Sequence, residues 1–156
     1  STKVLFCVGT FGLLLCMYGH HVEQSNLKSD SYTAFCDIDE RISCSKVMMG
    51  EWSHLFSKLR LVPKGSLLDL SNIVLGAIFY SIVTTVSVLP SPLTKTASKL
   101  LFYFSVPVFA TTVYLLYILL FVLKDLCMIC TTLHVLNAVV LFFSYKGGFR
   151  VEKKDD

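Results

Sequence analysis

The sequence predicts an all-α integral membrane protein: a bundle of four transmembrane helices with a loop-built cap at one end. Of its 156 residues, 54% are hydrophobic and only 16% are charged, which is more apolar than a soluble domain of this size. The apolar residues also gather into four runs, 4–22, 73–89, 100–123 and 127–145. Each run has roughly 17 to 24 residues and, as a helix, spans about 25 to 36 Å, enough to cross the hydrocarbon core of a bilayer.

The length is that of a single domain, which we take as 1–156. The first run follows Lys3, as the apolar part of a signal peptide would. It is about 19 residues long, however, and it ends in Tyr18-Gly19-His20-His21 instead of a small-residue cleavage site. We therefore expect 4–22 to be a retained helix.

The distribution of charge predicts the orientation. Basic residues lie in the connection 90–99 and in the tail 146–156, namely Lys95, Lys99, Lys146, Arg150, Lys153 and Lys154, whereas the long loop 23–72 holds most of the acidic residues. Because short cytosolic loops are enriched in Lys and Arg, both termini are expected in the cytosol and the loop 23–72 on the other side. The net charge of +3 includes no basic patch interleaved with aromatic residues, which argues against a nucleic-acid partner.

A short amphipathic helix is predicted inside the long loop. Trp52, Leu55, Phe56 and Leu59 recur at the spacing of one helical face, with polar residues opposite. This pattern is typical of a helix lying on the lipid bilayer, and it also fits a short helix packed on the bundle alone.

The predicted topology sorts the six cysteines. Cys7 and Cys16 are nine residues apart in the first helix, on opposite faces, so they cannot pair and are expected to be free thiols. The other four fall on the non-cytosolic side: Cys36, Cys44, Cys127 and Cys130. An oxidising compartment preserves disulfides, so these four fit either redox-active or structural bridges.

The Cys127-Met-Ile-Cys130 pair is better suited to redox chemistry than to stapling. A disulfide across so short a loop removes little entropy from the unfolded chain. At the start of a helix, however, free N–H groups and the helix dipole stabilise a thiolate, and Lys124 adds a positive charge. A four-cysteine zinc site is disfavoured because seven residues separate Cys36 from Cys44, and we predict no metal.

Polar residues continue down the last helix as a single stripe of Cys127, Cys130, His134 and Asn137. Polar side chains at membrane depth face a functional cavity or bond neighbouring helices, and both interpretations stay open for His134 and Asn137.

On the second helix Asn72, Gly76, Phe79 and Val83 share a face, although Ser71-Asn72 alone would be an ordinary helix cap. A dithiol, an amide and apolar walls suit a flat, apolar molecule with carbonyl oxygens, such as a quinone.

These motifs together resemble the vitamin K epoxide reductase family. The resemblance rests on Cys36-Asp37, then Cys44-Ser45, Trp52, Ser71-Asn72 before Gly76-x-x-Phe79-Tyr80, and Asp125-Leu126-Cys127-Met128-Ile129-Cys130, and it covers essentially the whole chain. It implies an enzyme of the endoplasmic reticulum membrane whose active site faces the lumen. The expected substrates are vitamin K epoxide, reduced to the quinone, and vitamin K quinone, reduced to the hydroquinone, without a tightly bound cofactor.

The resemblance also implies residue roles. Cys127 and Cys130 would be catalytic, with Cys130 facing the substrate. Cys36 and Cys44 would relay electrons, Cys44 attacking Cys127 and Cys36 meeting a luminal thioredoxin-like partner. Asn72 would hydrogen-bond a quinone oxygen, and further substrate contacts are expected from Phe79, Leu123, Met48, Trp52 and His134.

Two of these positions depart from the usual pattern, since His134 stands where tyrosine is common and Met48 where phenylalanine is common. These departures bear on epoxide reduction and on sensitivity to warfarin-type anticoagulants more than on quinone reduction. A histidine could still donate a hydrogen bond, with shorter reach and a titratable proton. The ending Lys153-Lys154-Asp155-Asp156 resembles a dilysine retrieval signal of endoplasmic-reticulum membrane proteins, which acts on a cytosolic carboxy terminus.

Two alternative functions use the same residues. A quinone-linked oxidase would form disulfides in client proteins with the same cysteines. A non-enzymatic four-span scaffold of the tetraspanin or claudin kind would use luminal cysteines as structural disulfides, but the loop motifs of those families are missing.

Overall fold

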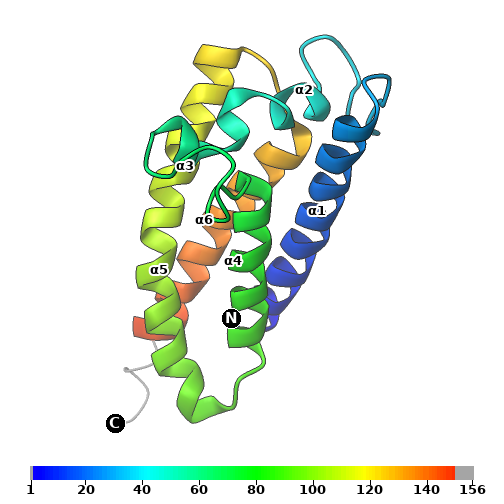
Figure 1. Ribbon diagram of the computed structural model, residues 1–156. Coiled ribbons are helices and arrows are strands. Elements are labelled where there is room, and N and C mark those ends of the chain that lie inside the picture. Colours follow the sequence, from blue (N-terminus) through cyan, green and yellow to red (C-terminus); the bar gives the residue numbers. More distant parts are fainter. Residues whose placement is uncertain (1, 150–156) are drawn as a thin grey trace.

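Helices make up almost all of the regular structure in the computed structural model, which describes residues 2–149 without the side chains of residues 91 and 92. The long elements are α1 (Thr2–Lys28), α4 (Asn72–Ser87), α5 (Ser91–Tyr117) with its π-helical extension η2 (Ile118–Leu123), and α6 (Met128–Phe149). Three short helices lie over one end of them (Figure 1): α2 (Cys44–Met48), η1 (Glu51–Ser53) and α3 (Leu55–Lys58). We call residues 44–58 the cap.

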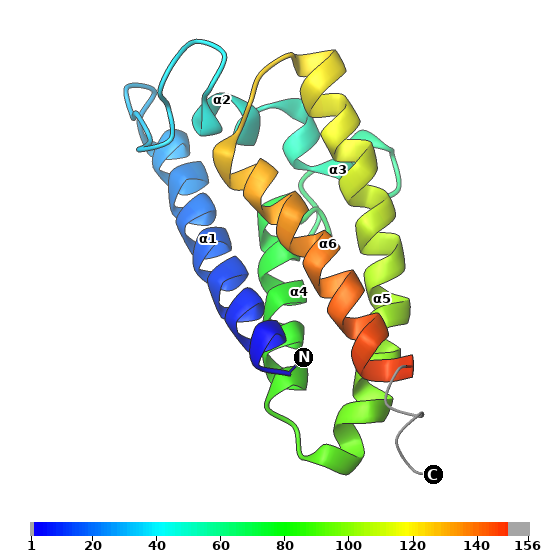
Figure 2. The same ribbon diagram turned by 180° about the vertical axis from the view of Figure 1, so that it is seen from behind.

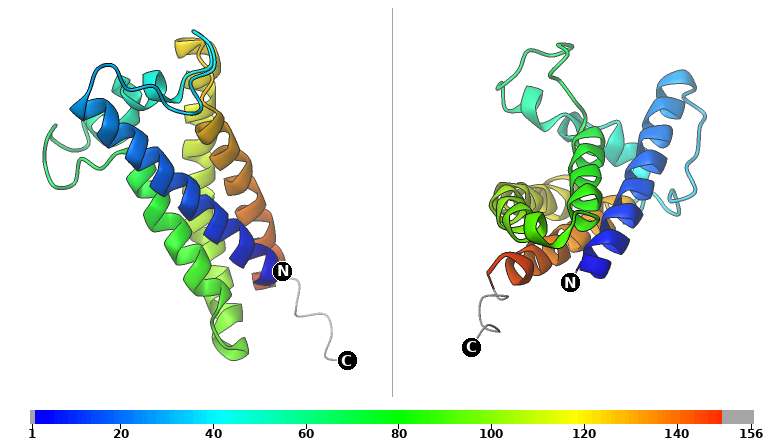
Figure 3. Two further views of the ribbon diagram at one scale, coloured as in Figure 1. Left: turned by 90° about the vertical axis from the view of Figure 1, so that its right-hand side faces the viewer. Right: turned by 90° about the horizontal axis from the view of Figure 1, so that it is seen from below.

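The four long helices form one bundle. Helix α1 packs along α4 and α6, and α5 packs along α6 and touches α4. Viewed from behind, α6 lies between α1 and α5 (Figure 2), and the side view in Figure 3 shows α1 and α4 lying together. The start of α1 and the end of α6 lie at one end of the bundle, and the cap lies at the other.

Glycines let α1 and α4 approach closely. A Cβ atom added to Gly12 would lie 2.5 Å from the ring of Tyr80, so this ring packs directly on the backbone of α1. The same tyrosine then ties α4 to α6, because its hydroxyl donates hydrogen bonds to the Leu133 carbonyl at 3.1 Å and to Asn137 Oδ1 at 2.7 Å.

The prediction of an all-α fold is confirmed for the described residues, and its long helices are compatible with membrane spans. Three helical segments are long and apolar enough to cross a bilayer: Thr2–Lys28, Leu93–Leu123 and Met128–Phe149. Helix α4 is also apolar but has only 16 residues. Between residues 2 and 149 there are isolated bridges and no strands that form a sheet.

Several predicted boundaries are wrong. The loop predicted from residue 23 begins after Lys28, because helix α1 continues through its polar last turns. There the Asn26 side chain bonds back to the Val22 carbonyl at 2.9 Å. The hydrophobic run 4–22 marked only the part of the helix that would contact lipid.

The third and fourth helices are also longer than the runs 100–123 and 127–145. Helix α5 begins at Ser91, directly after Pro90, where a helix start is favoured. Helix α6 continues to Phe149, so the predicted tail 146–156 begins as helix and its remainder lies outside the described residues.

The amphipathic helix predicted near Trp52 is broken into two pieces, η1 and α3. His54 separates them with non-helical backbone angles of φ −113° and ψ 75°. Both pieces are held by Asn72, whose amide donates to the Trp52 carbonyl at 2.7 Å and accepts from the Leu55 N–H at 3.3 Å. Tertiary hydrogen bonds therefore override the local helical pattern.

Candidate redox and substrate site

The four predicted redox cysteines lie together at the capped end of the bundle. Cys36 and Cys44 form a disulfide with 5.7 Å between their Cα atoms, whereas Cys127 and Cys130 are free thiols. Cys44 and Cys127 are both completely buried and belong to one packed cluster with Cys36. As predicted, Cys7 and Cys16 are also unpaired, one exposed and the other buried.

A short parallel bridge brings the two pairs side by side. Ile42 bridges Leu126, with the Ser43 N–H donating to the Leu126 carbonyl at 3.0 Å and the Leu126 N–H donating to the Arg41 carbonyl at 2.7 Å. Because the two segments run in the same direction, Cys44 and Cys127 both follow the bridge at the same end of it.

The Asp37 carboxylate holds the loop around the disulfide. It accepts hydrogen bonds from the N–H groups of Ala34 and Ser45, at 2.7 and 3.0 Å, and from the hydroxyls of Ser43 and Ser45, at 2.8 and 2.6 Å. Partial burial acts to raise the pKa of Asp37, but the hydrogen bonds, led by Ser45, outweigh it and leave the pKa below its ordinary value. An ionised Asp37 therefore anchors the first turn of α2, which begins at Cys44.

A second contact joins the cap to the turn before α6. Lys46 Nζ lies 3.0 Å from Asp125 Oδ2, and the Asp125 side chain is only 10% exposed. This ion pair adds a side-chain connection across the same bridge of backbone hydrogen bonds.

Cys127 precedes the spanning helix α6 and has an altered acidity. The pKa of Cys127 lies below its ordinary value, chiefly because the Cys130 thiol donates a hydrogen bond to it. Burial acts to raise this pKa, whereas hydrogen bonds from the N–H groups of Cys130 and Ile129 lower it further. The Cys130 N–H donates to the Cys127 sulfur at 3.3 Å. Cys127 is therefore more acidic than an ordinary thiol.

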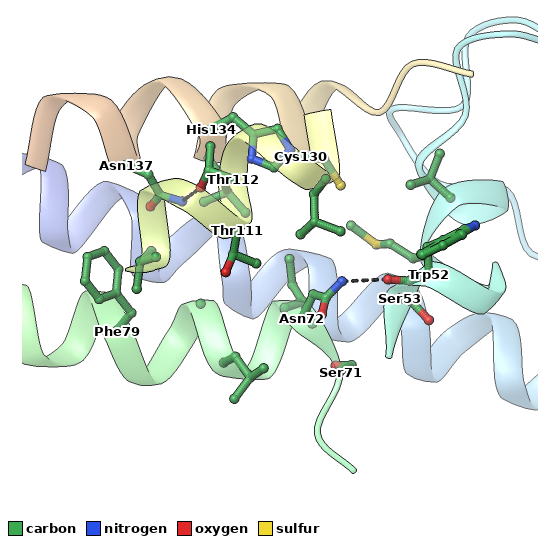
Figure 4. A pocket seen from close by; sticks show the side chains of 18 of the residues that line it. Trp52, Ser53, Ser71, Asn72, Phe79, Thr111, Thr112, Cys130, His134 and Asn137 are labelled. Atoms are coloured by element: carbon green, nitrogen blue, oxygen red, sulfur yellow. Dashed lines mark hydrogen bonds between the residues drawn. The ribbon is translucent and has the colours of Figure 1, made fainter. Parts of the chain in front are cut away.

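A cavity of about 350 Å³ lies among α4, α5 and α6 under the cap. Cys130 lines it, whereas Cys127 does not. The six residues predicted to contact substrate all line it too: Asn72, His134, Phe79, Leu123, Met48 and Trp52. Figure 4 shows Cys130 and His134 on one side, from α6, and Asn72 on the other, from α4. The structure thus brings the predicted residues together, while their roles remain predictions.

The walls of this cavity are mainly apolar, with polar groups in a few places. His134 Nδ1 is buried and has no hydrogen-bond partner among the described residues. One N–H of the Asn72 amide is used by the Trp52 carbonyl, which leaves the second N–H of that amide to donate elsewhere. Two hydrogen-bonding groups on opposite walls match an apolar ligand with oxygen atoms at its head.

Some residues at this site have partners that the sequence did not indicate. Asn137 accepts from Tyr80 and donates to Thr112 Oγ1 at 2.8 Å, so it bonds neighbouring helices, one of the two interpretations left open. The Ser71 hydroxyl makes no cap to its own helix and donates instead to Glu23 Oε2 at 3.0 Å. Glu23 was placed in the loop, and a carboxylate at the end of an apolar run was its only signal.

No group of three or more His, Cys, Asp or Glu side chains within residues 2–149 is arranged to hold a metal ion. The chemistry available from the described residues is therefore that of a dithiol, a neighbouring disulfide and a few hydrogen-bonding groups around an apolar cavity.

Comparison with known proteins identifies relatives. Residues 3–145 match the model of the Vitamin K epoxide reductase family. The Vitamin K epoxide reductase complex subunit 1 of Rattus norvegicus is 34% identical over 136 residues, which cover 86% of this chain and 83% of that protein. The protein of the same name from Mus musculus is 33% identical over the same shares. With a family match over nearly all of its length and relatives at this level of identity, the chain belongs to the vitamin K epoxide reductase family.

Proposed function

We propose that this protein is a membrane thiol-disulfide oxidoreductase that reduces vitamin K epoxide, vitamin K quinone or both. One observation carries the proposal: Cys130 lines an apolar cavity, whereas its partner Cys127 does not and packs in the buried cluster that also holds Cys36 and Cys44. A dithiol with one thiol toward an apolar ligand and the other toward a second cysteine pair is suited to transfer electrons from that cysteine pair to the ligand. Membership of the family supports vitamin K as the substrate class.

The reaction balances with the dithiol alone as reductant. Vitamin K quinone accepts two electrons and two protons and becomes the hydroquinone, while Cys127 and Cys130 become a disulfide. With the epoxide, the dithiol supplies the same electrons and protons, the epoxide oxygen leaves as water, and the quinone is formed. In each case the Cys130 sulfur bonds to the substrate first, and Cys127 then attacks the Cys130 sulfur and breaks that bond.

The second cysteine pair restores the dithiol. The Cys44 thiolate attacks Cys127 and forms a mixed disulfide, releasing Cys130; Cys36 then attacks Cys44 and releases Cys127. The products are the Cys36–Cys44 disulfide and two free thiols, and this is the pairing found in the structure. The lowered pKa of Cys127 favours the last step, since a more acidic thiol is a better leaving group. A thioredoxin-like partner in the lumen would then reduce Cys36–Cys44.

The cavity residues would bind and orient the substrate. The free N–H of Asn72 and the unpartnered nitrogen of His134 are suited to hydrogen-bond oxygens of the quinone. Phe79, Leu123, Met48 and Trp52 would enclose its apolar rings.

We further propose that α4 is the fourth transmembrane span. It is about 24 Å long at ~1.5 Å per residue, and it packs along α1, whose length and hydropathy suit a span. Four crossings put the start of α1 and the end of α6 on the same side, consistent with both lying at one end of the bundle. The charge distribution supports an orientation with both termini in the cytosol and the cap in the lumen of the endoplasmic reticulum.

Turnover by the detergent-solubilised protein tests the function. Vitamin K epoxide and vitamin K quinone are supplied separately with a dithiol reductant, and wild type is compared with Cys130→Ala. Cys7→Ala is the matched control, because Cys7 is a free, exposed thiol outside the cavity. We expect turnover of at least one substrate that is lost in Cys130→Ala and kept in Cys7→Ala. Equal turnover in all three proteins would refute the proposal.

The turnover pattern also separates the alternatives. Quinone turnover without epoxide turnover would favour a quinone reductase or a quinone-linked oxidase that forms disulfides in client proteins. A complete lack of cysteine-dependent turnover, with Cys36–Cys44 fully oxidised under all conditions, would favour a scaffold with structural disulfides.

A further inference from the structure

Glu23 is a buried carboxylate in the wall of the cavity. It lies in the last turns of α1, is 7% exposed and lines the cavity. A carboxylate is rarely buried to this degree unless it has polar or cationic partners, because removing its charge from water is costly. Its partners therefore indicate what the residue does.

The partners of Glu23 come from three parts of the chain. The Ser71 hydroxyl, directly before α4, donates to Oε2 at 3.0 Å. His20 Nδ1, one turn earlier on α1, lies 3.6 Å from Oε2, and its side chain is half exposed. His54 Nε2 lies 3.6 Å from Oε1 and is the partner that belongs to the cap.

His54 connects the cap to two acidic residues of the bundle end. Its Nε2 faces Glu23, and its Nδ1 lies 3.2 Å from both the carbonyl and Oδ1 of Asp69. The pKa of Asp69 lies below its ordinary value, chiefly because of the hydrogen bond from the Gly65 N–H, with smaller contributions from Ser57 and His54. The imidazole therefore lies between α1 and the segment that leads into α4.

The position of His54 in the cap makes this contact important for the cavity. It stands between η1 and α3, and its neighbours Trp52, Ser53 and Phe56 line the cavity. Asn72 provides a second attachment of this stretch, through its hydrogen bonds with Trp52 (Figure 4) and with Leu55. If His54 were released, residues 52–56 would keep the Asn72 hydrogen bonds and the ring contact of Trp52 with Tyr114 but would lose their contact with α1 through Glu23.

We propose that Glu23 and His54 form a latch that closes the cap over the cavity and thereby positions the substrate. Neither residue needs to touch the reacting atoms, so both are positioning residues. The closure of the cap stands on the contacts described above, whereas its effect on substrate binding rests on the proposed function. The two parts can be tested separately.

Trp52 provides a direct signal for closure. It is the single tryptophan of the chain, lies in the cap two residues before His54, and packs edge-on against Tyr114 of α5 at 6.3 Å between ring centroids. Quenching of its fluorescence by acrylamide measures how far solvent reaches it. Acrylamide is neutral, so variants that change a charge do not change the local concentration of the quencher.

The first experiment measures this quenching in the ligand-free, full-length protein. The variants are Glu23→Gln, His54→Gln and the double variant, with His21→Gln as the control, because His21 lies on the same helix, is exposed and makes its contacts with Ser25 and Tyr32. We expect each single variant to raise the quenching constant by at least about twofold, and the double variant to raise it no further, as for a directly coupled pair. Wild-type quenching in both single variants, or additive effects in the double variant, would overturn the latch.

The second experiment adds phylloquinone, whose binding is followed by quenching of Trp52, and then turnover with a dithiol. A latch predicts a larger Kd and KM in Glu23→Gln and His54→Gln, with the alkylation rate of Cys127 unchanged. If the buried Glu23→Gln variant fails to fold, His54→Gln carries the test, since the His54 side chain is 38% exposed. A wild-type protein that binds neither phylloquinone nor its epoxide would refute the proposed function, while the acrylamide results would still decide the latch.

Discussion

Replacing Asp37 by asparagine is predicted to slow electron transfer from Cys44 to Cys127. Each carboxylate oxygen accepts one backbone N–H and one hydroxyl: Oδ2 from Ala34 and Ser45, Oδ1 from Ser45 and Ser43. The hydroxyls can rotate and accept from an amide NH₂, but the backbone N–H groups cannot. Either orientation of the asparagine amide therefore sets an NH₂ group against a backbone N–H.

The magnitude follows from that single mismatch and the lost charge. Leaving a buried donor unpaired costs about 2 kcal/mol, and 2 kcal/mol corresponds to roughly a 30-fold change in an equilibrium constant. We expect the loop at Cys36 and Cys44 to be released from its place beside Cys127 by that factor. The fold of the bundle should be unaffected, because Asp37 contacts only the loop and the start of α2.

The assay starts from fully oxidised protein and adds reduced thioredoxin. Mass spectrometry of alkylated peptides follows the appearance of the Cys127 and Cys130 thiols with time. Asp39→Asn is the matched control, since Asp39 is an exposed residue of the same loop whose side chain accepts only the Glu40 N–H. Transfer at the wild-type rate in Asp37→Asn would refute the reasoning.

Acid should mimic the substitution. Because the folded-state pKa of Asp37 lies below its ordinary value of about 3.9, its contribution is present at neutral pH and is lost as the pH falls through the folded-state pKa. The wild-type transfer rate should therefore approach that of Asp37→Asn only in strongly acidic solution.

Three further predictions address the dithiol, the partner and the bundle. Iodoacetamide should modify Cys127 at a lower pH than an ordinary thiol, and Cys130→Ala should shift its pH–rate curve upward; an unchanged curve would mean that Cys130 does not set its acidity. Phe35 is 97% exposed beside Cys36, so Phe35→Ser should slow reduction of Cys36–Cys44 by thioredoxin but not by dithiothreitol, and equal slowing by both would exclude a docking role. Gly12→Leu should lower the melting temperature strongly by displacing the Tyr80 ring, whereas Gly65→Ala, which has no neighbour within 4 Å but a φ of +79°, should cost only the strain of a left-handed backbone, about 1 kcal/mol.

The sequence predicted the positions of the long helices best, because these depend on a local pattern of apolar residues. The hydrophobic runs located all four long helices, because a segment that contacts lipid must be apolar over its length. Their ends were missed, since the polar residues that continue α1 to Lys28 lie beyond any apolar pattern. The cavity residues were found through the resemblance, and the helical stripe of Cys130, His134 and Asn137 placed three of them on one face.

Contacts between distant segments were beyond sequence reasoning. Nothing local indicates that Ile42 bridges Leu126 or that His54 faces Glu23, because each pairing depends on how the loop returns over the bundle. The break at His54 is similar, since the helical pattern around it was sound and hydrogen bonds from Asn72 and Asp69 overrode it.

The spacing of the Cys127-Met-Ile-Cys130 pair explains how one dithiol serves two environments. A quinone needs an apolar cavity, whereas a protein reductant works in water, and a single thiol cannot face both. Cys127 precedes α6 and is packed beside the bridge that holds Cys44, while Cys130, within the first turn, lines the cavity. In the proposed mechanism Cys127 receives the electrons from Cys44 and Cys130 delivers them to the substrate, so two electrons would reach the cavity without movement of the helix. The cap can therefore stay closed over the substrate during electron transfer, which is the state that Glu23 and His54 are proposed to hold.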